Sequence, residues 1–277
     1  MALSIYDLRL AQRVVNEQTG SNLRVDGAIG PASQTAIRKW QVQNNLAQTG
    51  QIDDKTWGAM GTYISQRFVT VDDVANAAKN SGLPASVLLA FWEVESVGAG
   101  FLNDGRCTIL FEGHKFYEYV SARISQKQAQ AWNRAYPNLC FPKWDAKSYI
   151  GGGGEWRRFE QARALDATCA MLSTSWGLFQ LMGFNYNFGG FADVQSMVEA
   201  HIATEHNHLN AILNFINTYR ISVGGANKMG IRFTSLRDAV VAKDFKAIAA
   251  IYNGAGYAAN KYDERMKTAD AVWARRF

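Results

Sequence analysis

Cysteine, proline and long apolar runs are scarce in this sequence of 277 residues, and each scarcity excludes a class of protein. The three cysteines, Cys107, Cys140 and Cys169, are too few for a disulfide framework and fit no zinc spacing, which favours folding in a reducing compartment. The four prolines argue against a proline-rich linker architecture. No run of about 18 apolar residues occurs, so we expect no membrane-spanning helix.

A targeting segment and a strongly basic patch are missing as well. Residues 1–9 lack a basic start followed by an apolar run, so no secretory signal is expected. The net charge is +5 and the pI about 9.1, and the densest basic clusters are the pairs Arg157-Arg158 and Arg275-Arg276. This mild charge argues against nucleic acid as a partner and suits approach to an anionic polymer or surface.

The composition is that of a folded chain with one large domain or two unequal ones. Hydrophobic residues make up 48%, and there are 8 Trp, 11 Tyr and 15 Phe. This content excludes a disordered chain and supplies a sizeable core.

Residues 8–60 alternate short helices with tight turns. Apolar residues at helical spacing predict a first helix that ends at Gly20. Asp-Gly and Gly-Pro pairs mark a turn at Val25–Pro31, and a second helix ends near Asn44. A further turn leads to Asp54, which we expect to cap a third helix.

The same region carries a specific motif. The pattern V-D-G-x-x-G-P-x-(S/T)-x-x-A-(V/I)-x-x-(F/W)-Q runs from Val25 to Gln41, and Thr-Trp follows at Trp57. It resembles the three-helix peptidoglycan-binding module, which implies a small all-α wall-binding bundle that we bound at residues 1–65. The wall-binding residues that this resemblance implies are Asp26, Gly27, Trp40, Gln41 and Trp57. The two tryptophans fit the core of a helical bundle equally well.

A glutamate lies on the apolar face of a helix predicted over residues 85–96. At about 100° per residue, Glu95 falls between Leu88 and Phe91, whereas Glu93 falls on the opposite side and is expected to be solvated. Burial disfavours the charged form of a carboxyl group, so Glu95 is predicted to have a raised pKa and to be able to donate a proton. The pattern alone also fits a carboxylate that is neutralised by a buried arginine.

Three blocks follow one another in a characteristic order: Glu95-Ser96-x-Gly98, Ser175–Gly183 and Ile251–Tyr257. They resemble the E-S-x-G, G-(L/A)-x-Q-(L/I)-M and A-Y-N-x-G elements of goose-type lysozymes and soluble lytic transglycosylases. Together with the segment up to His114 and Tyr149, they are similar to the N-acetylmuramidase domain common in phage endolysins of Gram-negative hosts. The resemblance implies a mainly α fold, with a mostly helical lysozyme-like domain over residues 66–277 and a short β-hairpin around Cys107–His114.

The resemblance makes Glu95 the general acid of a glycosidase. The candidates for a second catalytic group are Asp104, Glu112, Thr174 and Ser175. Glycoside hydrolysis commonly uses two carboxyl groups, so either carboxylate is a candidate base, and either hydroxyl could instead place a water molecule. Asp104 also fits a turn, and Glu112 also fits a pair with Arg106.

The resemblance further implies substrate contacts by Ser96, Trp176, Gln180, Tyr252 and Asn253. The Gln180 amide suits an N-acetyl or hydroxyl group of a sugar, and the Tyr252 hydroxyl is expected near the acid. Trp176 can stack on a sugar or belong to the core.

Two further patterns have competing interpretations. His201, Glu205 and His208 share one helical face, as in a zinc amidase or peptidase, but solvated helix residues fit better and no metal is expected. Residues 262–277 form a predicted amphipathic helix, which could press on an anionic outer membrane or pack on the core with its basic side solvated.

These observations predict a modular phage endolysin that cleaves the β-1,4 bond between N-acetylmuramic acid and N-acetylglucosamine. We expect it to act as a monomer on bacterial peptidoglycan with no cofactor. It would be made in the host cytoplasm and reach the periplasm through a separate pore-forming protein. The alternatives are a lytic transglycosylase, a zinc amidase or peptidase, and a non-catalytic wall-binding protein.

Overall fold

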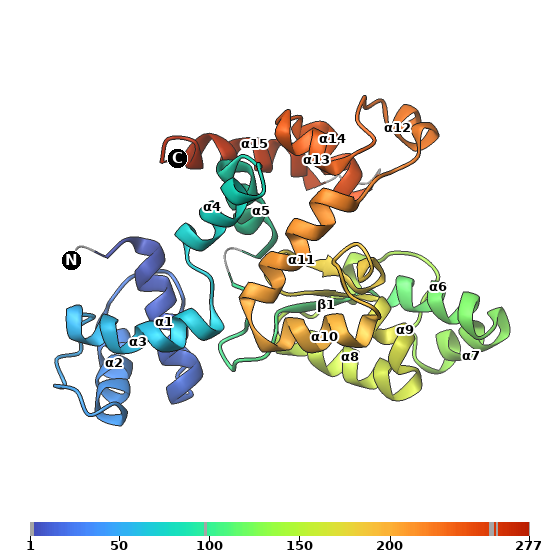
Figure 1. Cartoon of the computed structure of the whole chain (residues 1–277). Coiled ribbons are helices and arrows are strands. Elements are labelled where there is room, and N and C mark those ends of the chain that lie inside the picture. Colours follow the sequence, from blue (N-terminus) through green and yellow to red (C-terminus); the bar gives the residue numbers. More distant parts are fainter. Residues whose placement is uncertain (1–2, 97–98, 255–257, 259, 277) are drawn as a thin grey trace.

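The structure is a computed structural model that describes residues 3–96, 99–254, 258 and 260–276, and it is mainly helical (Figure 1). The predicted positions Gly98, 255–257 and Phe277 lie outside the described residues. The mainly α fold class is confirmed. The helices are α1 (Ile5–Thr19), α2 (Pro31–Gln43), α3 (Asp54–Arg67), α4 (Val71–Asn80), α5 (Ala85–Ser96), α6 (Gly113–Arg123), α7 (Gln126–Ala135), α8 (Gly153–Leu165), α9 (Ala167–Leu172), α10 (Val194–Ala203), α11 (Glu205–Thr218), α12 (Val223–Met229), α13 (Leu236–Val241), α14 (Phe245–Asn253) and α15 (Tyr262–Trp273), with short 3-10 turns at η1 (Ala146–Ser148) and η2 (Gly183–Asn185).

Helices α1 to α3 form a three-helix bundle at the N-terminal end of the molecule (Figure 1). Gly20 ends α1 in the left-handed conformation, at φ 67°, which glycine adopts without steric cost. Pro31 opens α2, where its missing N–H costs no hydrogen bond. The cap of α3 is Asp53 and not Asp54 as predicted, because the Asp53 carboxylate accepts the Thr56 N–H at 2.8 Å.

The chain leaves this bundle through α3, which continues to Arg67. The predicted boundary at residue 65 therefore falls inside a helix, and the connection to the next element is Phe68–Thr70. Thr70 then caps α4 in a capping box with Asp73. Phe68 and Val69 are fully buried, so the connection is part of the core and not a solvated linker.

Helix α5 is the central element of the second part. It packs against α4 on one side and α15 on the other, and its residues from Ser86 to Trp92 are all buried. The C-terminal helix α15 lies along α5 although nearly the whole domain separates them in the sequence (Figure 1). The packing of α15 against α5 brings an early helix and the last helix of the second part close together, near the C-terminal end of α5.

A small antiparallel sheet lies beside these helices, in the order β1 (Ile109–Phe111), β2 (Thr174–Trp176) and β3 (Leu181–Met182). Leu110 pairs with Ser175, and Ser175 pairs with Met182. The hairpin is thus formed by β2 and β3, whereas Cys107–His114, where it was predicted, supplies a single strand. The local pattern could not reveal this, because the partner of β1 lies more than sixty residues downstream.

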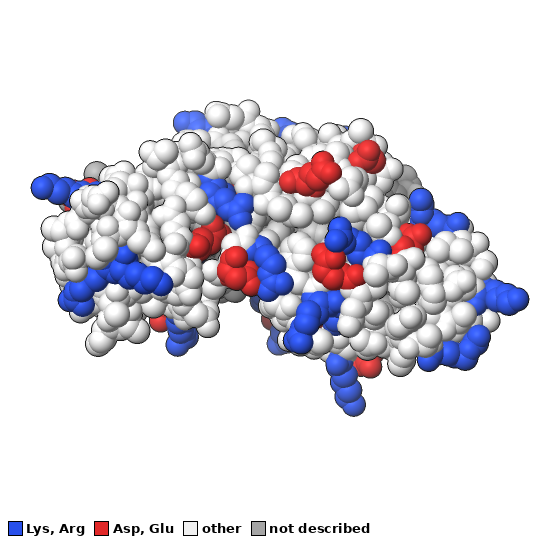
Figure 2. Space-filling model, turned by 90° about the horizontal axis from the view of Figure 1, so that it is seen from below, with Lys and Arg blue, Asp and Glu red and all other residues white. Residues whose placement is uncertain are grey.

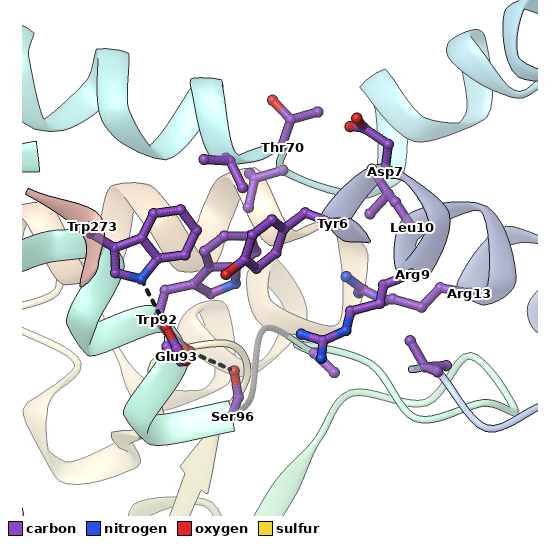
Figure 3. A pocket seen from close by; sticks show the side chains of 14 residues that line it. Tyr6, Asp7, Arg9, Leu10, Arg13, Thr70, Trp92, Glu93, Ser96 and Trp273 are labelled. Carbon is purple, nitrogen blue, oxygen red and sulfur yellow. Dashed lines mark hydrogen bonds between the residues drawn. The ribbon is translucent and has the colours of Figure 1, made fainter. Parts of the chain in front are cut away.

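An aromatic cluster joins the N-terminal bundle to the second part (Figure 3). The Tyr6 ring lies with its centroid 4.9 Å from that of Trp273 and 6.2 Å from that of Trp92. The Trp273 Nε1–H donates to Glu93 at 2.8 Å. Glu93 is exposed as predicted, and it also ties α15 to α5.

Charged side chains of both signs are mixed on the face shown in Figure 2, where a notch separates the two lobes. None of the helices described here is long and apolar enough to cross a membrane.

Candidate active site

The Glu95 carboxyl group lies in the last turn of α5 and lines a cavity formed by several distant segments. Its lining residues are Glu95, Leu110, Glu112, Ser175, Gln180, Leu181, Met182, Asn185, Phe215, Tyr252 and Asn253. Residues of all three sequence blocks therefore meet in one cavity. The site is built by the end of α5, the three strands and the end of α14.

Burial raises the pKa of Glu95 to about 7. The Tyr262 hydroxyl and the nearby Arg265 lower the pKa, but their effect is smaller than that of burial. The Tyr262 O–H donates to Glu95 Oε1. Arg265 does not neutralise the carboxylate by a direct pair, because its Nη2 donates instead to the Val94 carbonyl at 3.0 Å. The partner of Glu95 is thus a phenol, and the predicted alternative of a buried arginine is wrong.

Glu112 lines the same cavity, where one hydroxyl group donates to it and one imidazole lies nearby. The Tyr149 O–H donates to Glu112 Oε2, and His114 Nδ1 lies 3.3 Å from the same oxygen. The pairing of Glu112 with Arg106 is wrong, because Arg106 pairs with Asp104.

Asp104 is placed away from Glu95. Its side chain is 50% exposed in a turn, where it accepts the Arg106 backbone N–H at 3.1 Å, and it lines a different hollow from Glu95. The structure supports its interpretation as a turn residue.

Ser175 and Gln180 form a polar wall of the cavity. The Ser175 Oγ–H donates to Gln180 Oε1 at 2.8 Å, and Gln180 Nε2 donates to the Gly177 carbonyl at 2.8 Å. Gln180 has φ 49°, a left-handed conformation that costs a non-glycine residue about 1 kcal/mol. Such strain persists where the surroundings hold it, often at functional sites.

Besides Asp104, three expected site residues lie outside the cavity. Thr174 and Trp176 are fully buried, so neither reaches a sugar: the Thr174 hydroxyl donates to the Ala170 carbonyl, and Trp176 packs edge-on against Phe159. They point to the face of the sheet opposite Ser175, as alternation along a strand requires. Ser96 instead lines a second cavity, between the N-terminal bundle and α5, which is shown in Figure 3.

Tyr252 and Asn253 both line the cavity, but the hydroxyl that touches the Glu95 carboxyl group belongs to Tyr262. The Tyr252 O–H donates to the Phe179 carbonyl at 2.6 Å. Tyr262 and Tyr149 are the residues that sequence reasoning missed. The sequence shows Tyr262 only as the first residue of the C-terminal helix. Its contact with Glu95 follows from the packing of α15 against α5, which the sequence pattern does not show.

Comparison with known proteins decides the family. The family model described as N-acetylmuramidase matches residues 84–274, more than half of the chain. This chain belongs to the N-acetylmuramidase family. A second model, described as a putative peptidoglycan-binding domain, matches residues 7–60.

A solved structure resembles the whole muramidase. It is the crystal structure of the Burkholderia AP3 phage endolysin, with 31% identity and a TM-score of 0.60, covering 97% of this chain and 96% of that one. No curated protein sequence matches. The two predicted modules are therefore confirmed: the protein is a peptidoglycan-cleaving glycoside hydrolase with a peptidoglycan-binding domain before its catalytic domain.

In the binding domain of this muramidase, the motif residues mainly hold turns. Gln41 is fully buried, and its amide binds the Gln51 carbonyl and the Gly50 N–H of the second turn at 3.0 and 2.9 Å. Trp40 is buried too, so direct wall contact by these two side chains is wrong.

The other wall-binding candidates differ in exposure. Gly27 is buried at φ 82°, where an added Cβ would lie 2.6 Å from Ile5. Asp26 and Trp57 are partly exposed and remain available to a ligand.

His201 and His208 of the muramidase are buried and not solvated as predicted. His201 and His208 stack with ring centroids 4.7 Å apart, and burial lowers the pKa of each to about 3. Glu205 pairs with Arg13 instead of joining them. Among the residues that the structure describes, no group of His, Cys, Asp and Glu could hold a metal ion.

The C-terminal helix uses its apolar face inside the protein. Tyr262, Met266 and Trp273 of α15 are buried, so contact with an outer membrane would rest on its exposed residues, which are mostly polar or basic apart from Val272.

Proposed function

We propose that this muramidase is a phage endolysin and that Glu95 is its general acid. The observation that carries this proposal is the Glu95 carboxyl group, which has a pKa of about 7 and lines a cavity with residues from all three sequence blocks. At neutral pH a large fraction of such a carboxyl is protonated, so it can give a proton to the oxygen of the leaving sugar.

The geometry of the carboxyl group supports this role. The Tyr262 hydroxyl occupies Oε1 of Glu95, which leaves Oε2 to carry the proton. When the bond between N-acetylmuramic acid and N-acetylglucosamine breaks, Glu95 becomes charged, and the same Tyr262 hydroxyl stabilises that charge. Tyr262 thus holds the acid in place and helps it to release its proton.

Glu112 is the second group that we favour, because it is the other carboxylate lining the cavity. It would activate a water molecule or stabilise the developing positive charge on the sugar. Ser175 and Gln180 would bind polar groups of the substrate, and Tyr252 and Asn253, which line the same cavity, would contact it as well.

Glu95→Gln tests the assignment, because glutamine keeps the shape but has no proton to donate. We expect hydrolysis of purified peptidoglycan to fall by about 10²- to 10⁴-fold. Unchanged lytic activity would overturn the role of Glu95. Retained activity of the variant together with inhibition by a chelator would instead favour a zinc amidase or peptidase.

Mass spectrometry of the products tests the reaction class. A reducing muramic acid end identifies hydrolysis, whereas the same end with one water lost identifies a lytic transglycosylase. Wild-type protein that binds walls and releases no fragments would support a non-catalytic binding protein.

The surroundings of the reaction belong to the same proposal. The enzyme would act as a monomer in the periplasm, which it reaches from the host cytoplasm through a pore made by another protein. Contact with the anionic outer membrane would be electrostatic, through Arg275 and nearby basic residues, and would weaken as salt is added.

A further inference from the structure

A buried ion pair links the binding domain to the catalytic domain. Arg13 of α1 donates to both carboxylate oxygens of Glu205 at the start of α11, at 3.4 Å to Oε2 and closer to Oε1. Arg13 is 5% exposed and Glu205 is fully buried. The two residues lie 192 positions apart, so the pair forms only when both domains are in place.

Glu205 also holds the backbone that follows the catalytic glutamate. Its Oε1 accepts the Gly100 N–H at 2.8 Å, and its Oε2 accepts the Val69 N–H at 3.1 Å. Gly100 lies five residues after Glu95. One carboxylate therefore binds the first helix of the binding domain, the connection between the domains and the segment after the acid.

His208, one turn further along α11, binds the segment that precedes Gln180. Its Nδ1 accepts the Leu178 N–H at 3.1 Å, two residues before Gln180, and its Nε2–H donates to the His201 carbonyl at 2.6 Å. A Cβ on either Gly100 or Gly177 would come within 2.8 Å of this ring. The imidazole thus fills the space between the segment after Glu95 and the segment before Gln180.

A buried ion pair is an expensive way to hold two domains together. Its desolvation cost can exceed the attraction, and apolar residues of similar volume often stabilise a protein as well or better. The charged pair adds a fixed orientation, because hydrogen bonds from three residues, Arg13, Val69 and Gly100, hold the Glu205 carboxylate in place. The pair therefore contributes mainly by fixing the position of the groups that it binds.

We propose that Arg13 and Glu205 are positioning residues of the muramidase reaction. Arg13 orients the Glu205 carboxylate, and Glu205 with His208 sets the segments that carry Glu95 and Gln180. The peptidoglycan-binding domain is then part of the scaffold of the active site as well as an anchor to the wall.

Soluble substrate separates the two roles, because short glycan fragments released from peptidoglycan require no anchoring to a wall. We expect Arg13→Met and Glu205→Gln to lower kcat on such fragments by about 10- to 100-fold, since displacement of reacting groups by about 1 Å has costs of this size. KM should change less than kcat. The alkaline limb of the pH profile of kcat should shift, because Glu95 would sit in a changed environment.

Two further variants keep the test sharp. Lys55→Met removes a positive charge from an exposed site of the same domain and should leave turnover of soluble fragments unchanged. The double variant Arg13→Met, Glu205→Gln removes both charges and avoids an uncompensated buried one. Its amide oxygen can still accept a backbone N–H, so the variant is expected to remain folded.

The double variant decides the proposal. If it melts cooperatively near the wild-type temperature and shows reduced kcat with a shifted pH profile, the pair is a positioning device. If it keeps the wild-type kcat and pH profile on soluble fragments, the pair is only structural and the proposal is wrong. Loss of activity on intact walls alone would also overturn it, because that result indicates anchoring.

Discussion

At the scale of single residues, the position of Glu95 raises the pKa of an ordinary carboxyl group to about 7, as the proposed role of proton donor requires. Burial in the cavity that Leu110, Phe215 and Tyr252 also line disfavours the charged form of the carboxyl group, and the Tyr262 hydroxyl donates to one of its oxygens. Glu93, two residues earlier, faces solvent and binds an indole. The same residue type therefore has two roles on one helix.

The raised pKa of Glu95 predicts how stability depends on pH. A pKa raised from 4.5 to about 7 means that the folded state holds its proton more tightly, so stability falls as pH rises from about 4.5 through 7. Glu95→Gln removes this loss. We expect the variant to exceed the wild type in free energy of unfolding by about 1–2 kcal/mol at pH 8.

Urea unfolding at pH 5 and pH 8 measures this difference. The gain of the variant should be larger at pH 8 than at pH 5. An equal gain at both values would show that ionisation of Glu95 does not cause it.

The two candidate second carboxylates are separated by matched substitutions. Glu112→Gln changes a group in the cavity with Glu95 and is expected to lower kcat by at least about 10²-fold. Asp104→Asn changes a half-exposed turn residue and should stay within about twofold of wild-type activity. The reverse order of effects in assays of soluble glycan fragments would transfer the role to Asp104.

At the scale of elements, the packing of α15 against α5 places the Tyr262 hydroxyl beside the Glu95 carboxyl group. Trp273 is 2% exposed and packs on Trp92 and Tyr6, whereas Val272, its neighbour on α15, is 55% exposed. Trp273→Ala is expected to cost about 3–5 kcal/mol of unfolding free energy, through lost packing and the cavity left behind.

Val272→Ala is the matched control on the same helix. It should change the unfolding free energy by less than about 0.5 kcal/mol, since its side chain is mostly in water. A similar loss in both variants, measured by chemical denaturation, would contradict the packing of α15 described above.

At the scale of the whole molecule, the two domains share one core. Buried residues run in a single cluster from Leu10 of α1 to Trp273 of α15, and Arg13 and Glu205 lie within the junction. Independent domains usually unfold separately, because few contacts cross their boundary. We therefore expect this protein to unfold in one cooperative transition.

Calorimetry with tryptophan fluorescence tests the expectation. Trp40 lies in the binding domain and Trp176 in the catalytic domain, so Trp40→Phe and Trp176→Phe variants report on each part. Coincident transitions are expected. A separate early fluorescence transition whose amplitude falls in the Trp40→Phe variant but not in the Trp176→Phe variant would show that the binding domain unfolds alone.

Local patterns were sufficient for much of the architecture. Gly20, Pro31 and Thr70 have the helix-ending or helix-starting roles that their types predict, because these depend on neighbours within four residues. The β-hairpin was misplaced, because the pairing of Leu110 with Ser175 depends on the fold of everything between them.

The histidines show the same limit. His201 and His208 were expected to share a solvated helical face, because a linear pattern does not show which side of a helix is covered by distant segments. The structure places His201 against Phe191, and His208 against Phe101 and between two glycine-containing segments. These contacts explain why both are buried and have a low pKa.

The sequence by itself determined the mainly helical class, the two modules, the proton-donor candidate Glu95 and the order of its three motifs. Those features depend on residue type and short spacing, which a linear pattern contains. The tertiary structure decided that Tyr262 touches Glu95, that Glu112 and not Asp104 shares its cavity, and that Arg13 reaches Glu205. These are contacts between distant segments, and only the packing of α1, α5, α11 and α15 brings their side chains together.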